Sequence, residues 1–245
     1  MTLLSLPRAV LLAALALPMA AQASPADYIF SPIVEDGERE IDSKAGIARD
    51  RDGRSAWAGS IGLEYGVNSW WATEATVNFG REAGASTRVD SLEWENRLQL
   101  TETGRRPYEI GLLFEVERAT RSDDGWELRY GPLLQAHWGA LQANLNLLFE
   151  RRLLANEQEP TEFGYQWQVR ARSDGTLDWG VQGFGELGRW DRWATRAEQS
   201  HILGPALFAR LGQDDDDPQV EAGLLLGTGG AAPRATLRLQ AMIPF

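Results

Sequence analysis

An alternation of apolar and polar residues recurs along almost the whole chain and constrains its fold more than any other feature. Residues 141–149 read LQANLNLLF, with apolar residues at the odd positions and mostly amides between them. Such a period of two is typical of a β-strand whose two faces meet different surroundings. The same pattern runs through 108–116, 126–138, 163–171 and 234–245, and more weakly through 57–67, 70–80, 88–100, 178–188, 200–211 and 218–227. With a first strand at about 37–47, the sequence predicts about twelve strands of ~10 residues each.

Residues that favour turns separate these runs. They stand at 52–53, 68–69, 104–107, 124–125, 139, 174–175, 214–218 and 227–233, where Gly, Asp, Asn and Pro are frequent. Because the connections are short, we predict one all-β domain over residues 37–245, a single antiparallel up-and-down barrel. An even count of strands suits a bacterial transmembrane barrel, whose tilted strands cross the bilayer in about 9–11 residues.

The first 23 residues have the composition of a secretory signal peptide. Arg8 precedes an unbroken apolar run at 9–17, and Ala21-Gln22-Ala23 fits a small-x-small cleavage site. We therefore expect export, cleavage after Ala23, and a mature chain that starts with an extended lead at 24–36. No stretch of 18 apolar residues follows, so a membrane-embedded form would have to cross with strands.

Alternation alone does not say which face points outward, because soluble barrels and β-sandwiches alternate as well. The strand count favours the outer membrane, since a lipocalin-like soluble barrel has about eight strands. Aromatic residues also stand near the ends of the runs, as expected for girdles at the two membrane interfaces. They are Trp57, Trp70, Trp71, Tyr108, Trp126, Trp138, Trp179, Trp190 and Trp193.

The end of the chain, an alternating strand that finishes in Phe245, resembles the C-terminal assembly signal of bacterial outer-membrane barrels. This resemblance implies that the barrel assembly machinery and outer-membrane lipid are partners of the chain. Other segments resemble a group of small, poorly characterised proteobacterial outer-membrane barrel proteins, porin-like or transporter-like. These segments are YIFSPIVEDGEREI at 28–41, LEYGVNSWWATE at 63–74, LEWENRLQL at 92–100 and HILGPALFARL at 201–211. The group implies an outer-membrane barrel and carries no activity that could be transferred.

If the apolar face meets lipid, the polar face lines the lumen. An arginine facing lipid at the midplane would cost about 2–4 kcal/mol, so the charged residues are expected inside. The lumen-lining candidates are Glu64, Glu74, Glu93, Glu95, Arg97, Glu109, Glu115, Glu127, Arg129, Glu150, Arg170, Glu186, Glu221 and Arg238. Two interpretations stay open. Glu and Arg could pair across neighbouring strands in a structural interior, or the surplus of carboxylates could form a small-solute channel that favours cations.

Composition argues against several other functions. The chain has no Cys, which excludes a disulfide framework and a Cys-based metal site, and its net charge of −11 argues against nucleic acid as a partner. A soluble periplasmic β-barrel that binds an apolar ligand remains an alternative, with the charged face outward. A barrel lipid hydrolase is a weaker one, because no motif gives His137 or His201 a nucleophile and an orienting group. Ser200 and His201 are adjacent and would point to opposite faces of a strand. We therefore predict a protein without a catalytic, metal or cofactor site.

Overall fold

The computed structural model describes residues 24–81, 86–121, 125–154, 159–212 and 217–245. Twelve strands make up most of this part of the chain. They are β1 (Arg39–Arg49), β2 (Ser55–Asn68), β3 (Trp71–Arg81), β4 (Arg88–Gln99), β5 (Tyr108–Ala119), β6 (Trp126–Trp138), β7 (Leu141–Leu153), β8 (Glu162–Ala171), β9 (Leu177–Arg189), β10 (Ser200–Arg210), β11 (Gln219–Gly227) and β12 (Ala235–Pro244).

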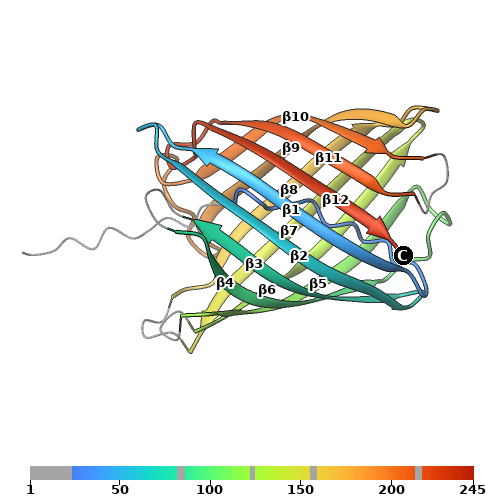
Figure 1. The fold of residues 1–245 in the computed structure, drawn as a ribbon, viewed down its shortest axis with the longest axis horizontal. Coiled ribbons are helices and arrows are strands. Elements are labelled where there is room, and N and C mark those ends of the chain that lie inside the picture. Colours follow the sequence, from blue (N-terminus) through green and yellow to red (C-terminus); the bar gives the residue numbers. More distant parts are fainter. Residues whose placement is uncertain (1–23, 82–85, 122–124, 155–158, 213–216) are drawn as a thin grey trace, which may run out of the picture.

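Each strand pairs antiparallel with the next one along the chain, and β12 pairs with β1, so the sheet closes into a barrel (Figure 1). The closing seam runs in register from Glu40 opposite Pro244 to Arg49 opposite Ala235. The predicted all-β, twelve-stranded, up-and-down barrel is thus confirmed. Most strand ends lie within two residues of their predicted positions. The largest difference is in β7, which continues past 149 to Leu153 because its backbone pairing with residues 126–129 of β6 persists there, although the apolar alternation has ended.

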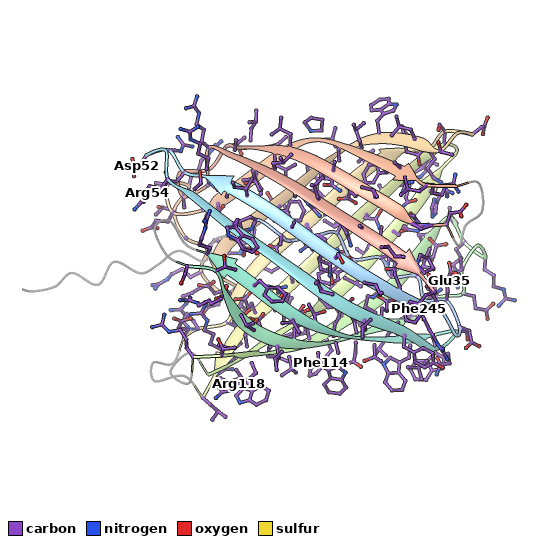
Figure 2. The ribbon with its side chains drawn as sticks, viewed as in Figure 1. Glu35, Asp52, Arg54, Phe114, Arg118 and Phe245 are labelled. Atoms are coloured by element: carbon purple, nitrogen blue, oxygen red, sulfur yellow. The ribbon has the colours of Figure 1, made fainter. Side chains whose placement is uncertain are left out.

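The two mouths of the barrel are distinguished by the C-terminus. The backbone amide of Phe245 donates to the carbonyl of Arg39 (3.0 Å), so the chain ends beside the start of β1. We call this mouth the terminal end and the opposite mouth the far end. Figure 2 shows Glu35 and Phe245 at the terminal end, and Asp52 and Arg54 in the β1–β2 turn at the far end.

Some connections at the terminal end are as tight as a hairpin allows. Only Gly139 and Ala140 join β6 to β7. Gly139 has a φ of +60°, in the left-handed region that glycine enters without steric cost and that tight hairpin turns require. The predicted turn at 139 is therefore present, and it holds the two strands in register.

The two faces of the sheet meet opposite surroundings. The outward positions carry large apolar side chains such as Leu63, Leu92 and Trp94, each more than half exposed. The inward positions carry the charged and amide side chains, many of them buried; Glu74, Glu95 and Glu115 are at most 3% exposed. This arrangement is the reverse of the one that a soluble barrel with its charged face outward requires.

Exposed aromatic side chains occur near both mouths. Trp70, Tyr108, Trp138 and Trp179 lie in or beside strand ends at the terminal end, and Trp126, Trp190 and Trp193 lie at the far end. Two bands of aromatic residues at the rims are the pattern of membrane-interface girdles.

Residues 24–38 run lengthwise inside the barrel before β1 begins, as the dark-blue segment in Figure 1 shows. The sequence predicted an extended N-terminal segment over 24–36, but it did not predict that this segment lies inside the barrel. Phe30 is 1% exposed and Val34 is 7% exposed, so this N-terminal segment is part of the packed interior.

Some predictions lie outside the described residues: the signal peptide at 1–23 and the acidic residues 124 and 214–216. Within the described ranges, no helix is long and apolar enough to span a membrane.

Candidate functional site: the interior of the barrel

The inner face carries a row of glutamates that strand pairing brings side by side. Directly paired positions on successive strands, from β1 to β8, hold Glu40, Glu64, Glu74, Glu95, Glu115, Arg129, Glu150 and Glu162. We call this row the glutamate ladder. Like charges placed directly opposite each other destabilise a sheet, so the ladder requires positive charge nearby.

The glutamate ladder leads from one mouth of the barrel to the other. Glu40 is the second residue of β1, which starts at the terminal end, and Glu162 is the first residue of β8, which starts at the far end. Because barrel strands are tilted, a row that follows direct pairing climbs along the wall. A path of carboxylates therefore spans the lumen.

Basic side chains from the same face pair with this row. Arg129 lies 3.4 Å from Glu115, 3.5 Å from Glu150 and 3.9 Å from Glu127. Arg97 contacts Glu64 and lies 3.2 Å from Glu95. These contacts compensate part of the negative charge of the ladder.

Lys44, the only lysine in the sequence, is buried in the lumen beside Glu74 of the ladder. Its ammonium lies 2.9 Å from Asp42 and 3.6 Å from Glu74, and it sits 3.4 Å from the centre of the Tyr28 ring. One cation thus links two wall strands to the N-terminal segment.

The structure places all fourteen lumen-lining candidates at inward positions. It brings Glu221 to 3.3 Å from Arg238, and Arg170 to 2.7 Å from Asp178. Glu109 lies 3.5 Å from the His137 ring, and Glu93 accepts a hydrogen bond from the Asn78 amide (3.0 Å). Glu186 lies on β9 near the far end, paired with Gly164 of β8, and its carboxylate occupies the space that a Cβ at Gly164 would need. The candidates therefore form several small clusters and not one site.

Sequence reasoning missed Glu40, Asp42, Lys44 and Asp178 as interior residues. The outward face of β1 carries Ser43 and Ala45, so the alternation there is too weak to identify the inward positions. Asp178 stands next to Leu177 at the start of a strand, where the pattern has only just begun. In both strands, the pairing register supplies the information that the residue types lack.

The N-terminal segment crosses the lumen and is held by side chains from several strands. The Tyr28 hydroxyl donates to Glu95 (2.5 Å), and the Val34 amide donates to the Gln99 side chain (2.7 Å). Arg97 donates to the carbonyls of Ser31 (3.1 Å) and Ile33 (3.4 Å). Asn146 donates to the carbonyl of Phe30 (3.2 Å).

Two apolar clusters fix the middle of this segment. Phe30 packs with Leu113, Leu133 and Leu148, with Tyr28 against them. On the opposite side, Ile29 packs against a cluster formed by Phe184, Ile202, Leu225 and Ala232. The segment therefore forms a bar across the lumen from β5–β7 to β9–β11. The leucines on the otherwise polar inner face are the one sequence signal that could have indicated it.

Glycines on the inner face make room for the backbone of the segment. A Cβ atom at Gly46 would overlap the carbonyl oxygen of Pro25, and one at Gly66 would overlap that of Glu35. The segment thus lies directly on the wall of β1 and β2 at both ends of its path.

A cavity of about 790 Å³ opens between the bar formed by the N-terminal segment and the terminal end of the barrel. We call it the terminal cavity. Tyr28, Ile29 and Phe30 bound it on the side that faces the far end. Ten acidic side chains and five arginines line it among the described residues, so the space is negative overall. Most of the acidic residues lie on β1–β5, together with Arg97, whereas Arg170, Arg172 and Arg210 lie on the other side with Asp178 and Glu221.

The histidines are not placed for hydrolase chemistry. Ser200 points inward and is 2% exposed, whereas the ring of His201 points outward and contacts the Tyr165 hydroxyl (2.9 Å). His137 contacts the Gln135 amide (3.0 Å) on the inner face. Among the described residues, neither histidine ring is hydrogen-bonded to a serine hydroxyl, which a Ser–His hydrolase requires.

No family model matches the chain, and no curated protein matches its sequence. Solved structures share its fold. The COG4313 outer membrane channel from Pseudomonas putida F1 aligns over 91% of this chain and 100% of that chain, with a TM-score of 0.63 and 13% identity. The NanC porin aligns over 82% of this chain and 97% of that chain, with a TM-score of 0.58 and 10% identity. These similarities show the fold of an outer-membrane β-barrel; the resemblance to the proteobacterial group stays a prediction.

Proposed function

We propose that this protein is a channel of the bacterial outer membrane for small solutes and that it favours cations. The glutamate ladder carries the proposal, because it places carboxylates along the lumen from mouth to mouth. Rings and rows of acidic side chains select cations in channels. The surplus of acidic over basic residues in the terminal cavity supports the same preference.

In this proposal the N-terminal segment is the constriction. The bar at Tyr28, Ile29 and Phe30 separates the terminal cavity from the far half of the lumen. A cation would pass between the bar and the glutamates of the wall. Large solutes would be excluded at this level.

Reversal potentials in planar bilayers test the cation preference. Glu95→Gln with Glu115→Gln removes two ladder carboxylates and leaves Arg97 and Arg129 less compensated. We expect the permeability ratio of K⁺ to Cl⁻ to fall at least twofold in a KCl gradient. Glu102→Gln with Glu198→Gln removes the same charge from exposed positions outside the strands and should leave the ratio unchanged.

Equal ratios in both double variants would refute selection by the ladder. Absence of current from the folded wild-type protein would refute the channel itself. In that case the ion pairs and the N-terminal segment would remain as the structural filling of a closed barrel.

The proposed location has its own test. A folded membrane barrel resists SDS until it is heated, so its band on a gel should shift on boiling. We expect this shift in the outer-membrane fraction. A soluble periplasmic protein without a shift would contradict the location and also the lipid contact of the outward apolar face.

Assembly through the barrel machinery is also part of the proposal. Phe245 follows β12 directly and is 70% exposed, so its side chain is accessible at the terminal end. The C-terminal strand also forms the closing seam with β1. Recognition of this strand before closure would couple delivery to the membrane with closure of the barrel.

A further inference from the structure

Three carboxylates meet in the middle of the lumen, away from the terminal cavity. Glu93 of β4 is paired directly with Glu117 of β5, and Glu115 lies two residues earlier on β5. One carboxylate oxygen from each of the three lies within 4.8 Å of the others. Three negative groups at this spacing repel one another, and a proton or a cation held between them relieves the repulsion.

The most buried member of this cluster has an oxygen without a donor. Glu115 is 1% exposed, and its Oε1 accepts no hydrogen bond among the described residues. Its other oxygen, Oε2, faces Arg129 at 3.4 Å. A buried carboxylate oxygen without a partner is costly, and a bound cation would satisfy it.

The neighbouring groups leave the cluster negative. Arg129 is shared with Glu127 and Glu150, so it does not neutralise all three carboxylates. Asn78 donates to one oxygen of Glu93 (3.0 Å) and to the Ser91 hydroxyl (3.1 Å), which fixes the Glu93 side chain in its position. Glu93 and Glu117 are partly exposed, so water and ions reach them from the lumen.

We propose that Glu93, Glu115 and Glu117 bind a divalent cation, and that this cation is Ca²⁺. All three ligands are hard carboxylate oxygens, which suit Ca²⁺ and Mg²⁺. Ca²⁺ accepts oxygen ligands in a flexible geometry, whereas Mg²⁺ demands a near-ideal octahedral one. Mg²⁺ is usually held by one or two carboxylates and keeps several waters, so a cluster of three carboxylates suits Ca²⁺. Water completes the coordination.

A bound Ca²⁺ would also act on conduction, a consequence that rests on the proposed function. It would place two positive charges beside the glutamate ladder and narrow the lumen at the level of Arg129. Millimolar Ca²⁺ should therefore reduce the K⁺ current. The binding site itself does not depend on the presence of a current.

Isothermal titration of the full-length mature protein in detergent with CaCl₂ tests the site. We expect one Ca²⁺ per chain and an affinity for MgCl₂ at least tenfold lower. Glu93→Gln with Glu117→Gln should weaken Ca²⁺ binding at least tenfold. The matched control, Glu162→Gln with Glu186→Gln, removes two inward carboxylates outside the cluster and should change the affinity less than twofold. Heat-dependent mobility in SDS verifies that each variant is folded.

The outcomes separate the site from the channel. Equal weakening in both double variants, or no saturable binding, would show general attraction of ions to an acidic lumen and overturn the proposal. Saturable binding lost only in the cluster variant would support it, even if no current is found. A K⁺ current without Ca²⁺ binding would overturn the site and leave the proposed channel intact.

Discussion

The docking of the N-terminal segment depends on Phe30, and truncating this side chain should release the segment. Phe30 is fully enclosed by Leu113, Leu133 and Leu148 of the wall. These leucines belong to strands whose backbone hydrogen bonds do not involve the segment. Phe30→Ala should therefore weaken docking and leave the barrel closed.

The size of the effect follows from burial. Removing a buried phenylalanine side chain costs about 3–5 kcal/mol. Because 1.4 kcal/mol is a factor of ten, the ratio of displaced to docked segment should rise by about a hundredfold or more. A displaced state populated at about 0.1% in the wild type would then reach roughly a tenth of the molecules.

Two measurements report on displacement. The first is single-channel recording, in which the Phe30→Ala variant should show long-lived states of higher conductance. The second uses the absence of native cysteine, so that a Val34→Cys background carries one thiol at a position 7% exposed in the docked segment. Modification of this thiol should be at least tenfold faster when Phe30→Ala is added.

The control is Phe114→Ala, which makes the same chemical change on the outward face of β5, where Figure 2 shows the side chain pointing away from the barrel. It should alter neither the conductance nor the rate of thiol modification. Wild-type conductance and wild-type thiol reactivity in Phe30→Ala would refute the view that this packing holds the segment in the lumen.

Three further predictions concern the wall and its assembly. Deleting Phe245 should lower the amount of folded protein in the outer-membrane fraction, measured by immunoblot of unboiled samples; unchanged amounts would remove its role as an assembly signal. Lys44→Met leaves Asp42 and Glu74 without their buried cation and should cost about 3 kcal/mol in urea unfolding, whereas Arg54→Met at the exposed far-end turn should cost no more than about 1 kcal/mol. Phe114→Arg should destabilise the barrel in lipid vesicles by about 2–4 kcal/mol, and an unchanged unfolding midpoint would mean that this face does not meet lipid.

The sequence was sufficient for the wall of the barrel because the wall is built from a local pattern. In β7, for example, apolar residues at 141, 143, 145 and 147 and amides at 142, 144 and 146 determine the face of each of these side chains without reference to any other strand. The inward placement of Glu95 and Arg129 follows from the same parity.

The filling of the barrel could not be predicted in this way. The segment around Phe30 has no period, and its partners come from distant parts of the chain: Gln99 binds the amide of Val34 across 65 residues, and Asn146 binds the carbonyl of Phe30 across 116. The glutamate ladder and the cluster at Glu93 depend on the register between strands. Hydrophobic alternation determines only the face to which each side chain points, and it does not determine this register. A pattern of residue types indicates that glutamates point inward but not which of them are neighbours.

The position of the N-terminal segment also has a consequence for biogenesis. Residues 28–30 of the segment pack against side chains of β5–β7 and β9–β11, which are synthesised later. These contacts span long stretches of sequence, so they form late in folding. If the predicted signal peptide is cleaved after Ala23, the segment becomes a free chain end that can enter through a mouth without threading through the wall. The residues synthesised first thus reach their final places last, and a barrel that closes before they arrive would hold water against the leucines of its inner wall.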